Sequence, residues 1–152
     1  MTLLRFRRSS DLKTTGVLTW YAVHGTSLLQ NNTLVTGDNK GVAAWLLERE
    51  MERDGSAAPG FVAGFSQATV GDTTPNVLGA WCDDGSGEMC SLENSTCADG
   101  KSQSCRGRGP AFEKVDAGTS SCFEIGRRQY AGARTILVSS PEPYPRILKR
   151  RG

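Results

Sequence analysis

The sequence predicts an α/β fold in which a mixed sheet is flanked by helices and carries a long loop. Residues 16–23 and 60–70 have the β-branched, aromatic and small side chains typical of strands. Residues 40–53 and 122–137 carry apolar side chains at the three- and four-residue spacing of amphipathic helices. Neither pattern persists between 71 and 118, where Gly, Asp, Ser and Cys are frequent. The order of the strands does not follow from these patterns.

The first strand, 16–23, is followed by a loop rich in Asn, Gly and Thr. Its few polar residues predict burial on both faces of the sheet. Asp38 or Asn39 can then act as the N-cap of the helix at 40–53. Gly55 follows this helix, where a residue in the left-handed conformation commonly ends one.

The second strand, 60–70, alternates small and aromatic residues, which places one set of side chains on a single face. The second helix, 122–137, is preceded by Ser121, and Glu124 lies three residues later. This spacing predicts a capping box at the start of the helix.

The last residues differ from the rest in composition. We expect one folded domain over 1–138 and a disordered tail over 139–152, because three prolines prevent a helix and the basic residues lack apolar partners. A basic end can attract nucleic acid or a membrane surface. So few charges, however, give only weak and salt-sensitive attraction.

Composition excludes two classes of protein. The 152 residues include 38% hydrophobic and 22% charged residues, the range of one ordinary folded domain. The 18 basic and 16 acidic residues give a net charge of +2, too balanced for the field of a nucleic-acid-binding domain. The apolar runs are far shorter than the roughly 18 to 20 residues of a membrane-spanning helix. We therefore expect no nucleic-acid partner and no membrane span.

Two features give conflicting indications of the cellular compartment. The first eight residues lack the apolar stretch of about 7 to 15 residues that a signal peptide needs. Five cysteines and two Asn-x-Thr sequons, at Asn31 and Asn94, nevertheless suit an oxidising, glycosylating compartment. We therefore expect an internal piece of a longer protein that is secreted or retained in the secretory pathway.

The long loop contains Cys82, Cys90, Cys97 and Cys105, with no Cys-x-x-Cys pair among them. A zinc knuckle or a redox pair is therefore disfavoured. Two disulfides are expected instead, each contributing roughly 2 to 4 kcal/mol. The spacing does not choose among the three possible connectivities. Cys122, the fifth cysteine, is either a buried thiol or bonded to a group outside this chain.

His24, the only histidine, follows the first strand, and ligands collect at strand ends in α/β folds. A lone histidine is more often a structural residue, because zinc requires three or four ligands. A metal site at His24 would therefore need ligands from outside this segment.

A second candidate is Thr74, in the segment Gly71-Asp-Thr-Thr-Pro-Asn76 directly after the second strand. Pro75 biases Thr74 towards extended backbone, which sets the direction of its hydroxyl. The same residue types are ordinary turn formers, and a hydroxyl becomes a useful nucleophile only beside a base or a metal. The sequence alone does not place His24 there.

Four stretches carry long motifs in a fixed order. They are Trp20-Tyr-Ala-Val-His24-Gly-Thr-Ser27, Thr36-Gly-Asp-Asn-Lys-Gly41, Gln67-Ala-Thr-Val-Gly-Asp-Thr-Thr-Pro-Asn-Val-Leu-Gly79 and the block from Cys82 to Cys105. Together they closely resemble the neutral ceramidase family, with fungal members the most similar. The resemblance covers about residues 1–133.

The resemblance implies hydrolysis of the amide of ceramide to sphingosine and a free fatty acid, with contact to a membrane or micelle surface. It implies one zinc ion held by two histidines, a glutamate and a tyrosine, with His24 as the second histidine. Zinc polarises the amide carbonyl and lowers the pKa of a water molecule. The other three ligands and an immunoglobulin-like domain fall outside this chain. We therefore expect the isolated chain neither to hold zinc tightly nor to cleave ceramide.

By resemblance, the catalytic serine of the family falls on Thr74. Threonine keeps the hydroxyl but adds a methyl group that stiffens and crowds it, so we expect reduced or absent activity. The resemblance also pairs Cys82 with Cys97 and Cys90 with Cys105, in a loop beside the lipid-entry site. The alternative is a non-enzymatic secreted module, in which the disulfide-stabilised loop is an interaction surface and the active-site motifs are relics.

Overall fold

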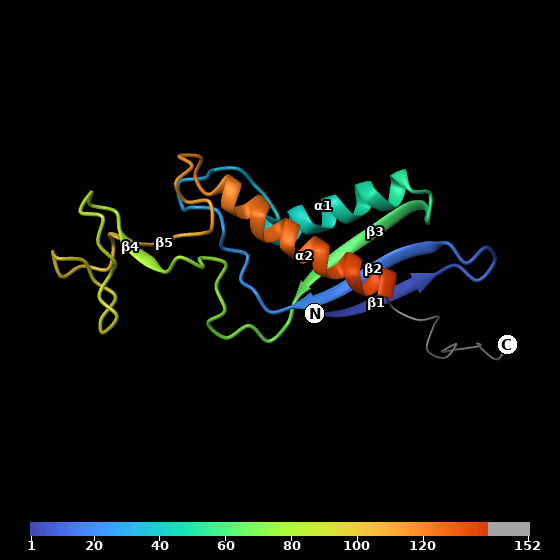
Figure 1. The fold of residues 1–152 in the computed structure, drawn as a ribbon, viewed down its shortest axis with the longest axis horizontal. Coiled ribbons are helices and arrows are strands. Elements are labelled where there is room, and N and C mark those ends of the chain that lie inside the picture. Colours follow the sequence, from blue (N-terminus) through green and yellow to red (C-terminus); the bar gives the residue numbers. More distant parts are fainter. Residues whose placement is uncertain (140–152) are drawn as a thin grey trace.

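The computed structural model describes residues 1–139 as a three-stranded sheet with two helices and a small second sheet (Figure 1). The elements are, in chain order, β1 (Thr2–Arg7), β2 (Thr14–Tyr21), α1 (Asp38–Arg53), β3 (Ala57–Gln67), β4 (Ala80–Cys82), β5 (Cys105–Gly107) and α2 (Thr119–Ser139). The predicted α/β class is confirmed.

The larger sheet is mixed, with the order β1-β2-β3. β1 pairs antiparallel with β2, and β2 pairs parallel with β3 through the crossover helix α1. The carboxyl ends of β2 and β3 therefore lie at the same edge of the sheet, and the loops of the chain extend beyond that edge (Figure 1). Ligand sites of α/β folds are found at such an edge.

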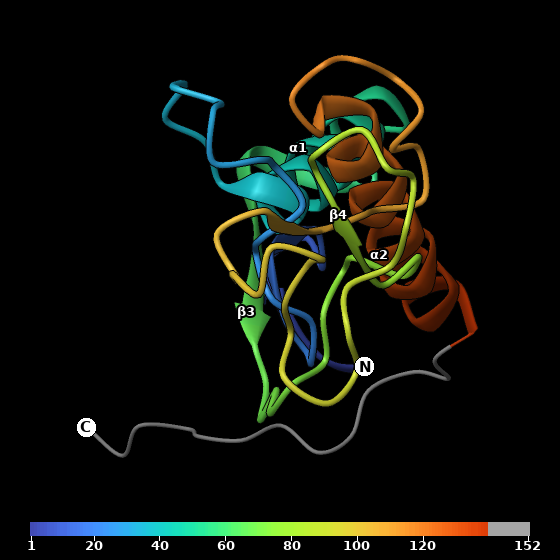
Figure 2. The same cartoon turned by 90° about the vertical axis from the view of Figure 1, so that its left-hand side faces the viewer.

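Both helices lie on one face of the sheet and pack against each other (Figure 2). The buried side chains of α1 include Ala43, Leu47 and Met51, spaced four residues apart on one side of the helix. They form the core with residues from the sheet and from α2, and the buried members of this cluster are Val17, Leu47, Met51, Ala57, Phe61, Ala63 and Ala133.

The opposite face of the sheet is uncovered by the described residues. Leu4 and Phe6 are 50% exposed and Val62 is 62% exposed. On the same face of β2, Leu18 and Trp20 are only half-buried, so the expectation that the first strand is buried on both faces is wrong. Val17 and Thr19 are buried beneath the helices, but the helices cover only one side.

The boundaries of the predicted elements also shift. β2 ends at Tyr21, and β3 begins and ends three residues earlier than the predicted 60–70. β1, β4 and β5 were not predicted, because β1 is an exposed, arginine-containing strand and the other two have only three residues each. Such short strands carry too few residues for a period-two pattern.

Both helix starts differ from the predicted caps. The residue at the N-cap of α1 is Gly37, and Asp38 already belongs to the helix. Ser121 lies inside α2, where its Oγ accepts a hydrogen bond from the amide of Ala111 at 3.0 Å, so it forms no capping box. Gly55, by contrast, has the predicted left-handed backbone, with φ of +67°.

The end of the chain lies outside the described residues from 140 onwards, so the prediction of a disordered tail stays a prediction there. Ser139, which was assigned to that tail, is the last residue of α2. Within residues 1–139 no helix is long and apolar enough to cross a bilayer.

The two glycines of α2 test the packing of the helices. A Cβ on Gly126 would lie 2.6 Å from Val42 Cβ and 2.7 Å from the Asn39 carbonyl oxygen, whereas one on Gly132 would lie 3.7 Å from its nearest neighbour, in Met1. We expect Gly126→Ala to destabilise the chain by about 1 to 3 kcal/mol through this close contact. Gly132→Ala should stabilise it by about 0.5 to 1 kcal/mol through helix propensity.

Denaturant unfolding of the two variants provides the comparison. Equal stabilisation by both alanines would show that α1 and α2 do not pack as closely as described.

Candidate functional site

His24 lies just beyond β2 and is held against the loop that follows β3. Its backbone amide donates to the carbonyl of Thr73 at 3.1 Å, and its Nε2 lies 3.0 Å from the carbonyl oxygen of Gly71. The side chain is half-buried. The structure thus brings the segments of His24 and Thr74 together, as the parallel ends of β2 and β3 require.

Thr74 is exposed, and its Oγ1 accepts a hydrogen bond from the amide of Asn76 at 3.2 Å. This bond spans two residues and forms a turn of the kind that Ser and Thr hydroxyls commonly stabilise. The intervening Pro75 is buried. The turn therefore fixes the position of the Thr74 oxygen on the surface beside the His24 segment.

Asn39 connects the His24 segment to both helices, and its side chain is fully buried. Its Nδ2, which carries two hydrogens, lies 2.9 Å from each of three acceptors, the carbonyl of His24, Ser27 Oγ and Asp38 Oδ1. Its Oδ1 accepts a hydrogen bond from Gln129 Nε2 of α2 at 2.8 Å. One buried amide thus joins α1, α2 and the loop after β2.

Asp38 holds the residues that follow His24. Its two carboxylate oxygens accept hydrogen bonds from the amides of Ser27 and Leu28, each at 3.0 Å. Oδ1 also accepts one from the amide of Asn39 at 2.7 Å. These donors compensate the burial of a carboxylate that is 8% exposed. Asp38 and Asn39 therefore shape the loop rather than cap the helix.

Lys40 completes this polar group at the ends of the two parallel strands. Its Nζ donates to the carbonyl of Tyr21 at 3.1 Å, and to the carbonyl of Ser66 and Gln129 Oε1 at 3.4 Å each. Burial lowers the pKa of Lys40 from its usual value. Sequence reasoning did not identify this residue, because the motif around it gives no indication that the side chain turns inwards.

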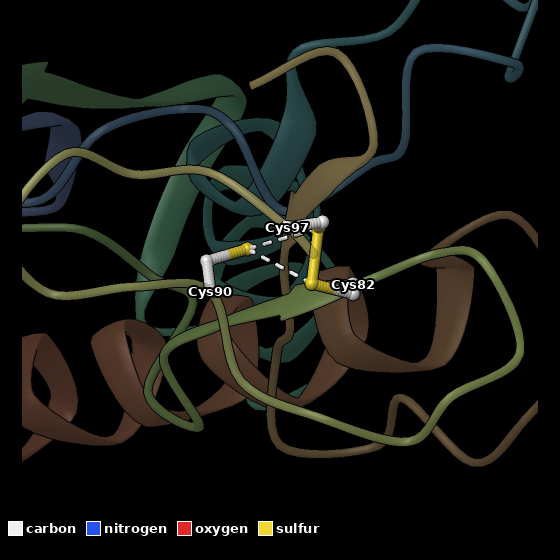
Figure 3. A group of neighbouring side chains, drawn as sticks. All are labelled: Cys82, Cys90 and Cys97. Carbon is white, nitrogen blue, oxygen red and sulfur yellow. Dashed lines mark hydrogen bonds between the residues drawn. A yellow bond between two sulfur atoms is a disulfide. The ribbon is translucent and has the colours of Figure 1, made fainter. Parts of the chain in front are cut away.

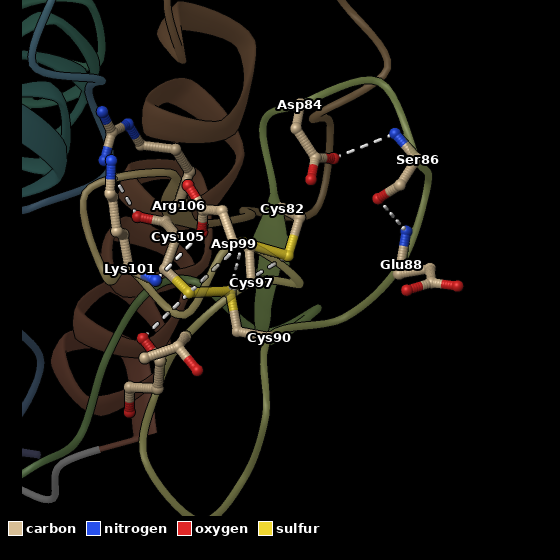
Figure 4. The surroundings of a disulfide bond; sticks show 12 residues. Cys82, Asp84, Ser86, Glu88, Cys90, Cys97, Asp99, Lys101, Cys105 and Arg106 are labelled. Carbon is tan, nitrogen blue, oxygen red and sulfur yellow. Dashed lines mark hydrogen bonds between the residues drawn. A yellow bond between two sulfur atoms is a disulfide. The ribbon is translucent and has the colours of Figure 1, made fainter.

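The cysteine-rich segment forms a small lobe, residues 80–107, built on the antiparallel pair β4 and β5. Disulfides join Cys82 to Cys97 and Cys90 to Cys105. The pairing implied by the resemblance is therefore confirmed. Figure 4 shows the short turns around these bonds, including the hydrogen bond from the Lys101 amide to Asp99 Oδ1 at 2.9 Å.

The lobe lies against the Thr74 loop. The amide of Leu78 donates to the Arg108 carbonyl at 2.9 Å, and the amide of Arg108 donates to the Gly79 carbonyl at 2.8 Å. The Arg108 guanidinium lies over the rings of Trp81 and Phe112, 4.8 and 4.3 Å from their centroids. These contacts pair the two segments that flank the lobe, the first of which directly follows the Thr74 turn.

The described residues do not form a zinc site by themselves. The one group of possible ligands with suitable spacing is Cys82, Cys90 and Cys97, whose sulfurs lie within 4.8 Å of one another (Figure 3). All three are in disulfides and so provide no thiolate. His24 is thus a single imidazole donor, and zinc requires at least two more protein ligands.

Two cavities are found elsewhere in the described residues. The larger, about 480 Å³, lies between the start of α2 and the loop before it. Its lining includes Leu46, Pro110 and Phe123. The smaller lies between Arg5, Met51 and the end of α2. Neither of these two includes His24, which is half-buried, or Thr74, which is exposed.

Comparisons with known proteins point to one family. The model of the family described as "Neutral/alkaline non-lysosomal ceramidase, N-terminal" matches residues 1–149. The chain is 40% identical over 133 residues to Neutral ceramidase B of Dictyostelium discoideum, covering 84% of this chain and 18% of that protein. It is 42% identical over 103 residues to Neutral ceramidase of Drosophila melanogaster, covering 67% and 14%.

Solved structures agree with these relatives. A structure titled "Ceramidase complexed with C2" superposes with a TM-score of 0.56 at 28% identity, covering 90% of this chain and 16% of that one. Neutral ceramidase from Pseudomonas aeruginosa gives a TM-score of 0.54 at 27% identity with the same coverage. The chain thus spans less than a fifth of each of these proteins.

Cys122 provides a test of this part of the structure. The thiol is free and 3% exposed, and burial, with a smaller contribution from the negative charge of Asp38, raises its pKa to about 12. At about pH 8 we expect iodoacetamide to alkylate Cys122 slowly in the folded chain and rapidly after unfolding in guanidinium, since the thiolate is the nucleophile. Mass spectrometry of the intact chain and its peptides measures this. Equal rates in both states would contradict the buried placement.

Proposed function

Because this chain belongs to the neutral/alkaline non-lysosomal ceramidase family, we propose that it forms part of a catalytic domain that hydrolyses the amide bond of ceramide. Water adds across the carbon–nitrogen bond, so that the acyl carbon leaves as a fatty acid and the nitrogen as the amine of sphingosine. The observation that carries the proposal is the pair of hydrogen bonds, at 3.1 and 3.0 Å, that hold His24 against the Thr73 and Gly71 carbonyls beside Thr74.

His24 is proposed as one ligand of a zinc ion, with the remaining ligands supplied by polypeptide outside this chain. When bound, zinc polarises a carbonyl oxygen and lowers the pKa of water. The uncovered sheet face, with Leu4, Phe6 and Val62 exposed, supports the view that this segment works as part of a larger domain.

Thr74 is proposed as the hydroxyl that faces the amide. The Asn76 amide donates to its oxygen, so the hydroxyl hydrogen remains available for donation to a substrate atom. The γ-methyl group of threonine restricts the rotamers of this hydroxyl and adds bulk beside it. Reduced turnover relative to a serine at this position follows from that geometry.

Exposed apolar side chains near the site support contact with a lipid surface. Val77 and Leu78, directly after the Thr74 turn, are 57% and 48% exposed. On the disulfide lobe, Met89 and Leu92 are 51% and 95% exposed. We propose that these residues contact the membrane or micelle from which ceramide is drawn.

A secretory compartment is proposed from two observations. Both disulfides are of the kind that forms and persists in oxidising compartments. The asparagines of both sequons, Asn31 and Asn94, are exposed and open to glycosylation.

The function is tested by grafting residues 1–133 in place of the matched segment of Neutral ceramidase B of Dictyostelium discoideum and measuring sphingosine release. We expect weak activity, which Thr74→Ser raises at least about tenfold by lowering the barrier about 1.4 kcal/mol. His24→Ala should reduce the activity to background. Thr119→Ser makes the same chemical change at an exposed position at the start of α2 and should have no effect.

The two variants test the proposed roles of Thr74 and His24 separately. Turnover that Thr74→Ser leaves unchanged would contradict the role of Thr74, and activity that survives His24→Ala would contradict the role of His24.

The isolated chain gives a second test. With one imidazole donor and its four lobe cysteines in disulfides, the chain should retain far less than one zinc ion after incubation with zinc and desalting. Elemental analysis of the oxidised protein measures this. Stoichiometric zinc would show that the described residues complete a metal site after all.

A further inference from the structure

We propose that Asn39, oriented by Lys40 through Gln129, is a positioning residue for His24. In this arrangement the imidazole donates its Nε2 hydrogen to the Gly71 carbonyl and keeps the lone pair of Nδ1 free for a metal ion. The metal-ligand role of His24 rests on the proposed function. The hydrogen bonds that orient the His24 ring are made within this chain, so they can be measured without metal or substrate.

The main chain at His24 is fixed on both sides. Its amide donates to the Thr73 carbonyl at 3.1 Å, and its carbonyl accepts from Asn39 Nδ2 at 2.9 Å. A few residues later, the amides of Ser27 and Leu28 bind the carboxylate of Asp38. The backbone that carries the imidazole therefore has little freedom to turn.

Among the described residues, the His24 ring has one hydrogen-bond partner, and that partner can only accept. Nε2 lies 3.0 Å from the Gly71 carbonyl oxygen, and a carbonyl oxygen can only accept. Nε2 must then carry the hydrogen, and in a neutral imidazole Nδ1 is left with the lone pair. Histidines that bind metals commonly donate their other ring hydrogen to a backbone carbonyl in this way.

The orientation of the Asn39 amide follows from a chain of hydrogen bonds that begins at Lys40. An ammonium group can only donate, so Gln129 Oε1, 3.4 Å from Lys40 Nζ, must accept. The Gln129 amide nitrogen then faces Asn39 Oδ1 at 2.8 Å, and the Asn39 nitrogen faces the His24 carbonyl. Lys40 thus sets the direction of every bond in the chain, and a reversed amide would place two oxygens against each other.

The backbone of Asp38 is the second sign of a demanding local geometry. Its φ of +49° lies in the left-handed region, which non-glycine residues seldom adopt. This conformation is maintained where the carboxylate reaches the amides of Ser27 and Leu28. Strained residues held by several hydrogen bonds are concentrated at functional sites.

The test uses the ring signals of His24, which are unambiguous because the chain has a single histidine. In the ¹⁵N-labelled chain, at mildly alkaline pH, we expect a hydrogen-bonded Nε2–H that exchanges slowly with water. Long-range ¹H–¹⁵N couplings should show Nδ1 without a hydrogen.

Asn39→Asp keeps the shape of the side chain and removes the donor, so the Nε2–H should exchange at least about tenfold faster. Lys40 lies two hydrogen bonds away from Asn39 and three away from His24, so Lys40→Met should give a smaller acceleration in the same direction. Leu47→Ala is the matched control, since it lowers stability through a core cavity on the same helix without touching these polar groups.

An Nε2–H that exchanges at the wild-type rate in Asn39→Asp, or one that Leu47→Ala accelerates equally, would overturn the proposal. If Asn39→Asp does not fold, Lys40→Met decides, and an unchanged rate there overturns it too. A slow Nε2–H in the isolated chain together with an inactive chimera would contradict only the proposed function.

Discussion

The buried side chain of Asn39 is the contact on which the arrangement of the candidate site depends. A buried amide is costly unless its donors and acceptor are paired, and here the partners come from α1, α2 and the loop after β2. Few arrangements of these three elements satisfy all the bonds. The position of His24 is therefore set by the packing of the two helices as much as by the strand that precedes it.

The disulfide lobe and the sheet are stabilised in different ways. The lobe has a small buried cluster of cysteines and relies on two covalent links, whereas the helices and the sheet share an apolar core. The uncovered face of the sheet carries Leu4, Phe6 and Val62, which water contacts in this chain. In the family relatives, most of the polypeptide lies outside the matched segment, and we expect part of it to cover this face.

Periodicity was sufficient for the two helices and for β2 and β3, because each buries one regular set of side chains. It was not sufficient for β1, where Arg5 and Arg7 interrupt the apolar pattern, nor for the three-residue strands of the lobe. The motif resemblance supplied the disulfide pairing. The proximity of His24 to Gly71 depends on the parallel pairing of β2 with β3, and the inward direction of Asp38 and Asn39 depends on tertiary contacts, neither of which local sequence encodes.

Amide hydrogen exchange at Ser27 and Leu28 tests most directly whether this polar group holds the site together. Both residues lie outside any helix or strand, and their amides bind only the Asp38 carboxylate in the described structure. The account predicts that these two amides are protected to an extent comparable with the interior of α1. Exchange as fast as that of the amide of Val35, a fully exposed residue, would contradict it.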